Sequence, residues 1–220
     1  HRRRHSFPTR RSSDLRLQLY FAPGTCALAV HIALTEAQAG HELVRVNFAE
    51  AQQRTPGYLA VNPKGRVPAL VTEQGVLTET PALLLYVAQR FPEAGLAPLD
   101  NPFLLARMQE VNSYLCSTVH INHAHRPRAS RWADEPEAIA AMQRKVAANM
   151  TENFQLIEKH YLQGPWVLGD TYSVADAYLY TVSTWLASDG VDVAQFPQVV
   201  AHRERLLQRP GVQQALASGA

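Results

Sequence analysis

The chain has 220 residues, of which 46% are hydrophobic and 18% are charged, and its formal net charge is +2. This length supports a full hydrophobic core in one or two domains, and no apolar run approaches the ~20 residues that a membrane span requires. The two cysteines, Cys26 and Cys116, are far apart in the sequence, so they form no disulfide framework and favour a reducing, cytoplasmic compartment.

Residues 1–15, HRRRHSFPTRRSSDL, are basic and polar and show no hydrophobic periodicity. They lack the apolar stretch of a secretory signal and resemble translated cloning sequence, so we expect a non-native or disordered basic tail. The alternative is a basic arm that binds nucleic acid or membrane. Without this segment the chain keeps 16 basic and 18 acidic side chains, a net charge of −2. We therefore expect no nucleic-acid and no membrane partner.

The first part of the chain alternates strand and helix patterns. Residues 16–24 alternate apolar and polar residues and end at Pro-Gly, which predicts a strand and its exit. Residues 25–37 have helical apolar spacing with Thr25 as a plausible N-cap, and residues 41–48 alternate again. This βαβ unit predicts two parallel strands. A hairpin around Gln74-Gly75 and a helix over 80–91 follow, and the sum resembles a thioredoxin fold.

The rest of the chain is helical in pattern. Residues 92–102 hold several prolines and a glycine, which indicates a linker. Beyond it we predict long helices over 103–125 and 137–161, and further helices over 172–187 and 196–216. We therefore expect four parts: a tail at 1–15, a thioredoxin-like α/β domain at 16–92, a linker at 93–101 and an all-α domain at 102–220.

Cys26 lies where the first predicted helix begins. Unpaired N–H groups and the helix dipole at such a position favour a thiolate, which lowers the pKa of a thiol and raises its reactivity. The same N–H groups can instead hold another thiolate or anion. Against this stands the reading of Cys26 as a small buried hydrophobic residue. Cys116 lies in the middle of a predicted helix, and we expect it to pack in the core.

Two further segments are weaker signals of a ligand-binding site. In RVPAL, residues 66–70, Pro68 removes a strand hydrogen-bond donor, so an edge position or a cis Val67–Pro68 bond is expected. A cis bond would leave the Val67 N–H and C=O free for a peptide-like ligand. Glu79 and Thr80 begin a helix. They either cap this helix or bind a ligand that carries both an amine and a carboxylate. In the second case they would offer it a carboxylate, a hydroxyl and a backbone N–H.

Polar clusters in the helical part have simpler interpretations. Ser173 and Asp176 form the pattern of a capping box, a folding signal without a catalytic role. His120 and His123 share a helix face that we expect to line a cleft, and since no third ligand is evident we predict no metal site. Arg126, Arg128 and Arg131 serve either anion binding or solvation.

Four segments together resemble a known family: YFAPGTCALAVHIAL, YLAVNPKGRVPAL, VLTETPALLLYVAQRF and YSVADAYLY. In order and at matching separations they follow the pattern of cytosolic glutathione S-transferases, over about residues 16–216. The cysteine after Pro-Gly is similar to that of the bacterial beta class. The resemblance implies a thioredoxin-like glutathione domain, a helical domain, a homodimer and a role in detoxification. It implies glutathione as co-substrate, with no cofactor or metal, and a small hydrophobic electrophile as the second substrate.

The resemblance also implies roles for particular residues. Cys26 matches the cysteine that faces the glutathione sulfur, and His120 matches a histidine that reaches over glutathione, so both are expected in the catalytic centre. Val67, before cis-Pro68, matches the residue whose backbone pairs with the cysteinyl part. Glu79 and Thr80 match the pair that binds the γ-glutamyl end.

Some positions depart from the beta-class pattern. Ala27 follows the cysteine where serine is usual, Ile121 replaces a basic residue after His120, and residues 52–54 supply no clear lysine. Tyr20 lies near the site, but on a strand, and does not match the tyrosine of other classes. As loose candidates for the wall that binds the electrophile we expect Leu104, Met108, Val111 and Tyr114, with most of them in the core.

Two rival functions stay open on the same fold. In the first, Cys26 forms a mixed disulfide with glutathione and reduces disulfides or peroxides. Ala29 stands where a resolving cysteine would be, so only a one-cysteine route with a second glutathione fits. In the second, the protein is not an enzyme and binds hydrophobic ligands or a protein partner.

Overall fold

The computed structural model describes residues 17–219, so the basic segment 1–15 lies outside the described residues. A four-stranded sheet is built from β1 (Leu17–Phe21), β2 (His41–Arg45), β3 (Ala69–Thr72) and β4 (Gly75–Thr78) in the order β2-β1-β3-β4. β1 and β2 are parallel, with Leu17 opposite His41, whereas β3 is antiparallel to both of its neighbours. The predicted βαβ unit and hairpin are confirmed.

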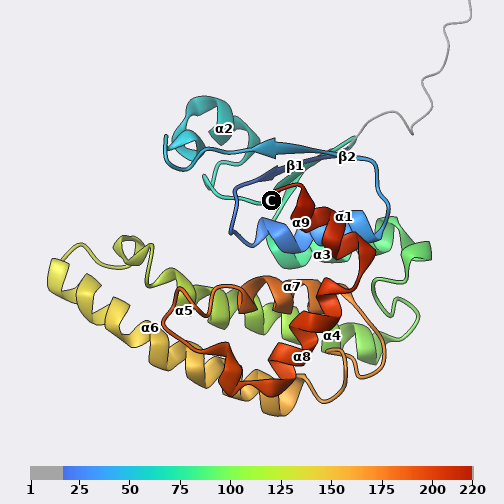
Figure 1. The fold of residues 1–220 in the computed structure, drawn as a ribbon. Coiled ribbons are helices and arrows are strands. Elements are labelled where there is room, and N and C mark those ends of the chain that lie inside the picture. The colour runs from blue at the N-terminus through green and yellow to red at the C-terminus, as the bar shows by residue number, and fades with distance from the viewer. Residues whose placement is uncertain (1–16, 220) are drawn as a thin grey trace, which may run out of the picture.

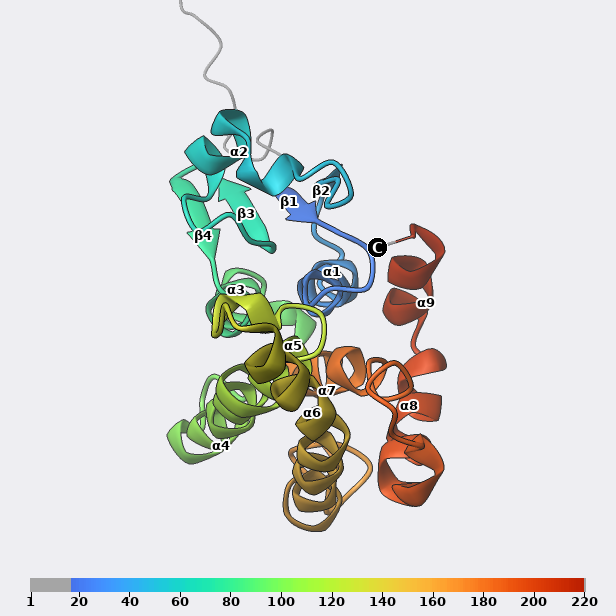
Figure 2. The same ribbon diagram turned by 90° about the vertical axis from the view of Figure 1, so that its left-hand side faces the viewer.

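Helices cover both faces of this sheet. α1 (Ala27–Glu36) and α3 (Thr80–Arg90) lie on the face toward the rest of the molecule, and α2 (Pro56–Val61) lies on the other, as Figure 2 shows. A short 3-10 turn, η1 (Gln52–Arg54), precedes α2. The segment between β2 and β3 thus contains a helix that the sequence analysis did not predict. This arrangement is a thioredoxin-like domain, as expected.

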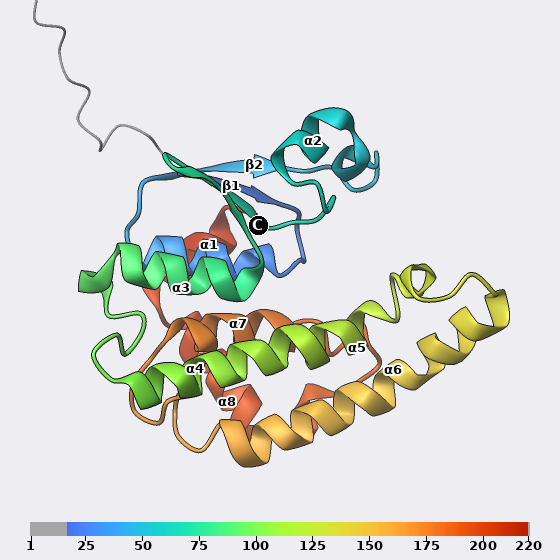
Figure 3. The ribbon, with the colours of Figure 1, turned by 180° about the vertical axis from the view of Figure 1, so that it is seen from behind.

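The remainder of the described chain is helical. Its elements are η2 (Pro92–Ala94), α4 (Pro102–Tyr114), η3 (Leu115–Val119), α5 (His120–Ala124), η4 (Ala129–Arg131), α6 (Pro136–Leu156), η5 (Ile157–Tyr161), α7 (Val174–Ser183), η6 (Val193–Gln195), α8 (Pro197–Leu207) and α9 (Pro210–Ala217). η3 and η5 are π-helical turns, so α4, η3 and α5 run on as one rod beside α6 (Figure 3). Within residues 17–219, no helix is long and apolar enough to cross a membrane.

The α1 helix is enclosed on all sides. Every residue from Ala27 to Thr35 is buried, because the sheet and α3 cover one side and α7 and α9 cover the other (Figure 1). The end of α1 is also tied to α9: the Thr35 hydroxyl donates to the Gly211 carbonyl at 2.8 Å, and Arg209 forms an ion pair with Glu36 at 2.5 Å. The two domains therefore share one helix as a common core.

The N-terminus of α7 carries the predicted capping box. The buried Asp176 carboxylate accepts hydrogen bonds from the backbone N–H of Ser173 at 2.9 Å and of Val167 at 2.8 Å, and it contacts Nε2 of His202 at 2.9 Å. Since α7 packs on α1, this carboxylate fixes the helix that supports the domain interface.

Replacing Asp176 by alanine should destabilise the fold strongly. The change leaves two buried N–H groups and an imidazole without their acceptor, so we expect the free energy of unfolding to fall by about 3 kcal/mol or more. Urea denaturation measures it. As a control, Asp192→Ala removes an exposed cap and should cost about 1 kcal/mol. Equal losses in the two variants would contradict the role given to Asp176.

Candidate active site

A cavity of about 520 Å³ lies between the two domains. The thioredoxin-like domain contributes Cys26, Val67, Pro68, Glu79 and Thr80 to its lining, and the helical domain contributes His120. The structure thus brings together all six residues that the sequence nominated for the site.

Cys26 is the N-cap of α1, so the helix begins one residue later than a Thr25 cap would place it. The thiol is buried, and its Sγ lies 3.8 Å from the Val67 carbonyl oxygen. Thr25 contributes by donating to the Ala22 carbonyl at 2.7 Å, which closes the turn before the helix. Cys26 therefore faces the edge of the chain at which a peptide-like ligand is expected.

The burial of Cys26 bears on the two interpretations that the sequence left open. Burial raises the pKa of Cys26, and a hydrogen bond from Thr80 and the charge of Arg128 oppose this only in part. Burial disfavours a charged sulfur, so it favours the interpretation of Cys26 as a small buried residue over that of a reactive thiolate. At neutral pH the Cys26 side chain is a neutral thiol, which can donate a hydrogen bond.

The Val67–Pro68 peptide bond is cis, as predicted. Among residues 17–219, neither the N–H nor the C=O of Val67 has a backbone hydrogen-bond partner. The preceding residue is held firmly, because the Arg66 carbonyl accepts from the Tyr58 hydroxyl at 2.6 Å and from the Asn62 amide at 2.7 Å. Burial raises the pKa of Tyr58 to about 12, so it stays a donor. The Val67 carbonyl oxygen has only the long contact with the Cys26 thiol at 3.8 Å, so the structure presents a peptide unit at a fixed place whose N–H is unpaired among the described residues.

Glu79 and Thr80 occupy the start of α3. Glu79 is the N-cap with a positive φ of 75°, and Thr80 is the first helical residue. The Glu79 carboxylate forms an ion pair with Lys64, whose ammonium also donates to the Thr78 hydroxyl at 2.7 Å. Sequence reasoning missed Lys64. The carboxylate, the hydroxyl and the N–H groups at the α3 start can bind an amine and a carboxylate of one ligand.

His120 covers the cavity from the helical domain and lies with its ring 4.9 Å from that of Trp185. Burial lowers the pKa of His120 to about 3, with a further contribution from the nearby positive charge of Arg128. The imidazole is therefore neutral at physiological pH. It can hydrogen-bond to a ligand, but it is too weak a base to hold a proton there.

Trp185, another residue that sequence reasoning missed, joins the helical domain to the turn before Cys26. Its indole N–H donates to the Gly24 carbonyl at 3.0 Å, and its ring stacks on His123 at 4.3 Å. Nδ1 of His123 lies 2.8 Å from the buried carboxylate of Asp189, which also accepts from Arg126 at 2.9 Å. This chain of contacts fixes the position of the turn that presents the thiol.

The cavity wall differs from expectation in part. Leu104, Met108, Val111 and Tyr114 do not line the cavity; Met108 and Val111 are buried in the core and Tyr114 packs against it, as expected for most of the four. Cys116 packs against the core, as expected, but it also lines the cavity. A π-helical turn begins at Leu115, so a helical period of 3.6 residues misplaces the faces beyond it.

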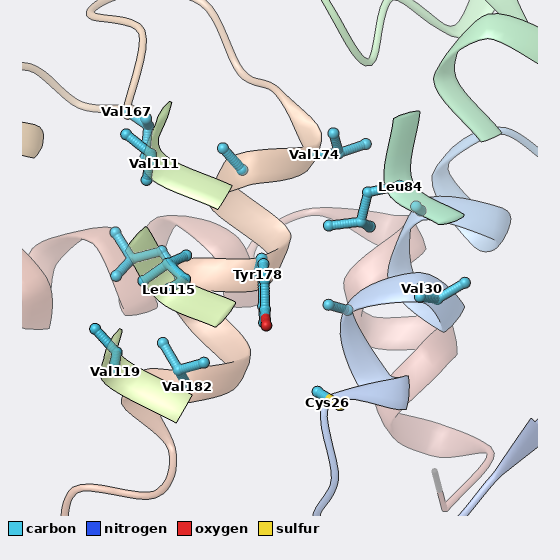
Figure 4. Packing of buried hydrophobic residues seen from close by; sticks show 14 of the residues in the cluster. Cys26, Val30, Leu84, Val111, Leu115, Val119, Val167, Val174, Tyr178 and Val182 are labelled. Carbon is cyan, nitrogen blue, oxygen red and sulfur yellow. The ribbon is translucent and has the colours of Figure 1, made fainter. Parts of the chain in front are cut away.

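Tyr178 extends from α7 toward α1 and Cys26 and also borders the cavity (Figure 4). Burial raises its pKa well above its ordinary value, so the phenol stays protonated. Its hydroxyl is buried without a hydrogen-bond partner among the described residues.

Comparison with known proteins agrees with this geometry. Residues 15–89 match the N-terminal domain of glutathione S-transferases, and residues 103–210 match the C-terminal domain. The chain is 31% identical over 206 residues to glutathione S-transferase GstA of Escherichia coli O157:H7, which covers 92% of this chain and 98% of that protein. The chain belongs to the glutathione S-transferase family.

Among solved structures, the chain is similar to bacterial glutathione transferases. A glutathione transferase homologue from Sulfitobacter with bound glutathione superposes with a TM-score of 0.91 at 45% identity, covering 93% of this chain and 98% of that chain. The beta-class glutathione S-transferase of Sphingomonas chungbukensis superposes with a TM-score of 0.81 at 34% identity, covering 92% and 98%. The similarity to the beta class is thus confirmed.

The raised pKa of Cys26 predicts slow alkylation at neutral pH. In a Cys116→Ala variant, iodoacetamide should modify Cys26 more slowly at pH 7 than it modifies free glutathione, and the rate should still rise as the pH passes the ordinary range of a thiol, because only the thiolate reacts. Intact mass against time gives the rate, with the variant that lacks both cysteines as the blank. Rapid modification at pH 7 would show that the helix field prevails after all.

Proposed function

We propose that the protein conjugates the thiolate of glutathione to small hydrophobic electrophiles. One observation carries the proposal: a buried thiol, a peptide unit with an unpaired N–H among the described residues and a carboxylate–hydroxyl pair line a single cavity. The Glu79 carboxylate binds the γ-glutamyl ammonium group, and Thr80 binds the γ-glutamyl carboxylate. The Val67 backbone pairs with the cysteinyl residue, which directs the glutathione sulfur toward Cys26.

In this proposal Cys26 stabilises the glutathione thiolate as a hydrogen-bond donor. The neutral thiol and the N-terminus of α1 both favour negative charge on the neighbouring sulfur. Each unit by which they lower the pKa of glutathione corresponds to ~1.4 kcal/mol. His120 stays neutral and hydrogen-bonds to glutathione, while the thiol proton passes to solvent.

The chemical step is a displacement or addition at an electrophilic carbon. With a chloronitroarene the sulfur lone pair forms a carbon–sulfur bond at the ring carbon, the carbon–chlorine bond breaks, and chloride leaves with its electron pair. Ile121, Pro127 and Trp132 form an apolar wall on the helical side of the cavity, which suits the body of such a substrate.

A second function is favoured by the position of Cys26 beside the Val67 carbonyl, where the glutathione sulfur would lie. There the Cys26 thiolate would attack the glutathione sulfur of a substrate–glutathione mixed disulfide, forming a protein–glutathione disulfide and releasing the substrate as a thiolate. A second glutathione thiolate would then attack this protein disulfide, restoring Cys26 and leaving as oxidised glutathione. The raised pKa of Cys26 disfavours this route at neutral pH.

Comparing the chain with its Cys26→Ala variant separates the two functions. We expect the variant to keep conjugation of glutathione to a chlorodinitrobenzene, with kcat/KM lowered by roughly tenfold, the value of one charge-assisted hydrogen bond. Absorbance of the conjugate measures this, and intact mass after oxidised glutathione measures disulfide exchange. If the wild type gains one glutathione readily at pH 7 and shows no conjugation, the redox function replaces the proposed one.

We also propose that the protein is a cytoplasmic homodimer that acts in detoxification, as the family resemblance implies. Val76 and Leu77 on the edge strand β4, and Phe103 and Leu104 at the start of α4, are exposed, and a partner subunit would remove them from water. Sedimentation velocity should give twice the mass of the chain. A monomer at micromolar concentration would refute the dimer.

A further inference from the structure

Three arginines bring uncompensated positive charge to the cavity. Arg66, Arg128 and Arg131 all line it, and within residues 17–219 none of them forms an ion pair. Among the described lining residues Glu79 is the one carboxylate, and Lys64 already pairs with it. The cavity therefore attracts anions.

Arg128 is the most constrained of the three. Its side chain is half-buried, and its Nε is withdrawn from solvent without a partner in the part of the chain that the structure describes. Burial lowers the pKa of Arg128, and burial together with the charges of Arg128 and Arg66 lowers the pKa of Arg131 to about 10. Both guanidinium groups remain charged at neutral pH. A buried donor without an acceptor costs free energy, which a bound anion would recover.

Glutathione accounts for only part of this charge in the proposed mode of binding. Arg66 directly precedes Val67, and the Gln53 side chain lies on the same domain at the cavity, so these two side chains suit the glycyl carboxylate. Arg128 and Arg131 come from the other domain, between α5 and α6. They line the cavity from the helical side, and the proposed mode of binding assigns no group of glutathione to them.

The residues around Arg128 and Arg131 indicate what the uncharged part of the second substrate is. Ile121, Pro127 and Trp132 line the cavity from the same part of the chain and offer an apolar surface with an aromatic ring. A planar guanidinium binds a carboxylate through two parallel hydrogen bonds. We infer that the electrophile taken by this site has an apolar or aromatic body and a carboxylate, and that Arg128 and Arg131 bind the carboxylate. This inference rests on the proposed function and names its substrate class.

A matched pair of acceptors tests the inference on the whole protein. Glutathione displaces chloride from a para-chlorodinitrobenzoate and from its neutral methyl ester by the same chemistry. After each kcat/KM is divided by the uncatalysed rate constant, we expect the wild type to prefer the carboxylate by roughly tenfold or more, the value of one charge-assisted interaction. Added salt should reduce this preference, because it screens the attraction.

Variants that remove one positive charge show which arginine causes the preference for the carboxylate acceptor. Arg128→Met and Arg131→Met should each lower kcat/KM for the carboxylate, by roughly tenfold for Arg128. Both variants should leave kcat/KM for the ester and the KM for glutathione nearly unchanged. Arg128→Lys should keep part of the kcat/KM for the carboxylate that Arg128→Met loses. Arg144→Met on the exposed side of α6 is the control and should change neither acceptor.

Other outcomes would overturn the inference in distinguishable ways. Equal corrected rates for the two acceptors would show that the arginines do not bind the carboxylate of the acceptor. A higher KM for glutathione in both variants would show that they serve glutathione itself. Both outcomes leave the proposed function standing. Turnover of neither acceptor would overturn the proposed function and the inference with it. If Arg128→Met fails to fold, the wild-type preference and the exposed Arg131 decide the question.

Discussion

No face of the α1 helix is turned to water. The sheet and α3 bury one side of it, and α7 and α9 bury the other, which is why its sequence is apolar almost throughout. Because α1 belongs to the core of both domains, its first turn is fixed relative to the helical wall. The Trp185 indole holds the Gly24 carbonyl and so adds a hydrogen bond at the same point. The position of Cys26 in the cavity follows from this enclosure.

The same enclosure sets the electrostatics of the site. Withdrawal from water raises the pKa of Cys26 and lowers that of His120, so both side chains are neutral at neutral pH. The start of α1 favours a thiolate, and the charge that can hold a second, anionic ligand comes from Arg128 and Arg131. Binding in this cavity is thus governed by fixed cations and neutral donors, and proton transfer by the protein plays little part.

Local signals in the sequence were sufficient for the fold and for choosing six residues that line one cavity. The turn before Cys26, the cis bond at Pro68 and the capping box at Asp176 each depend on a few adjacent residues, and all are found where predicted. The helical wall was not predictable in this way. Trp185 acts through a contact across 161 positions, and Cys116 reaches the cavity through a π-helical turn that no hydrophobic period marks. The pKa of Cys26 depended on burial, which only the packed structure gives.

The packing of α9 on α1 also has a consequence for folding during synthesis. Thr35 and Glu36 at the end of α1 find their partners in Gly211 and Arg209, in the last helical part of the described chain. A ribosome that has finished the thioredoxin-like domain has not yet synthesised the helices that cover α1. Domains often fold in the order of synthesis. Here one side of α1 is covered only after α7 and α9 have been synthesised.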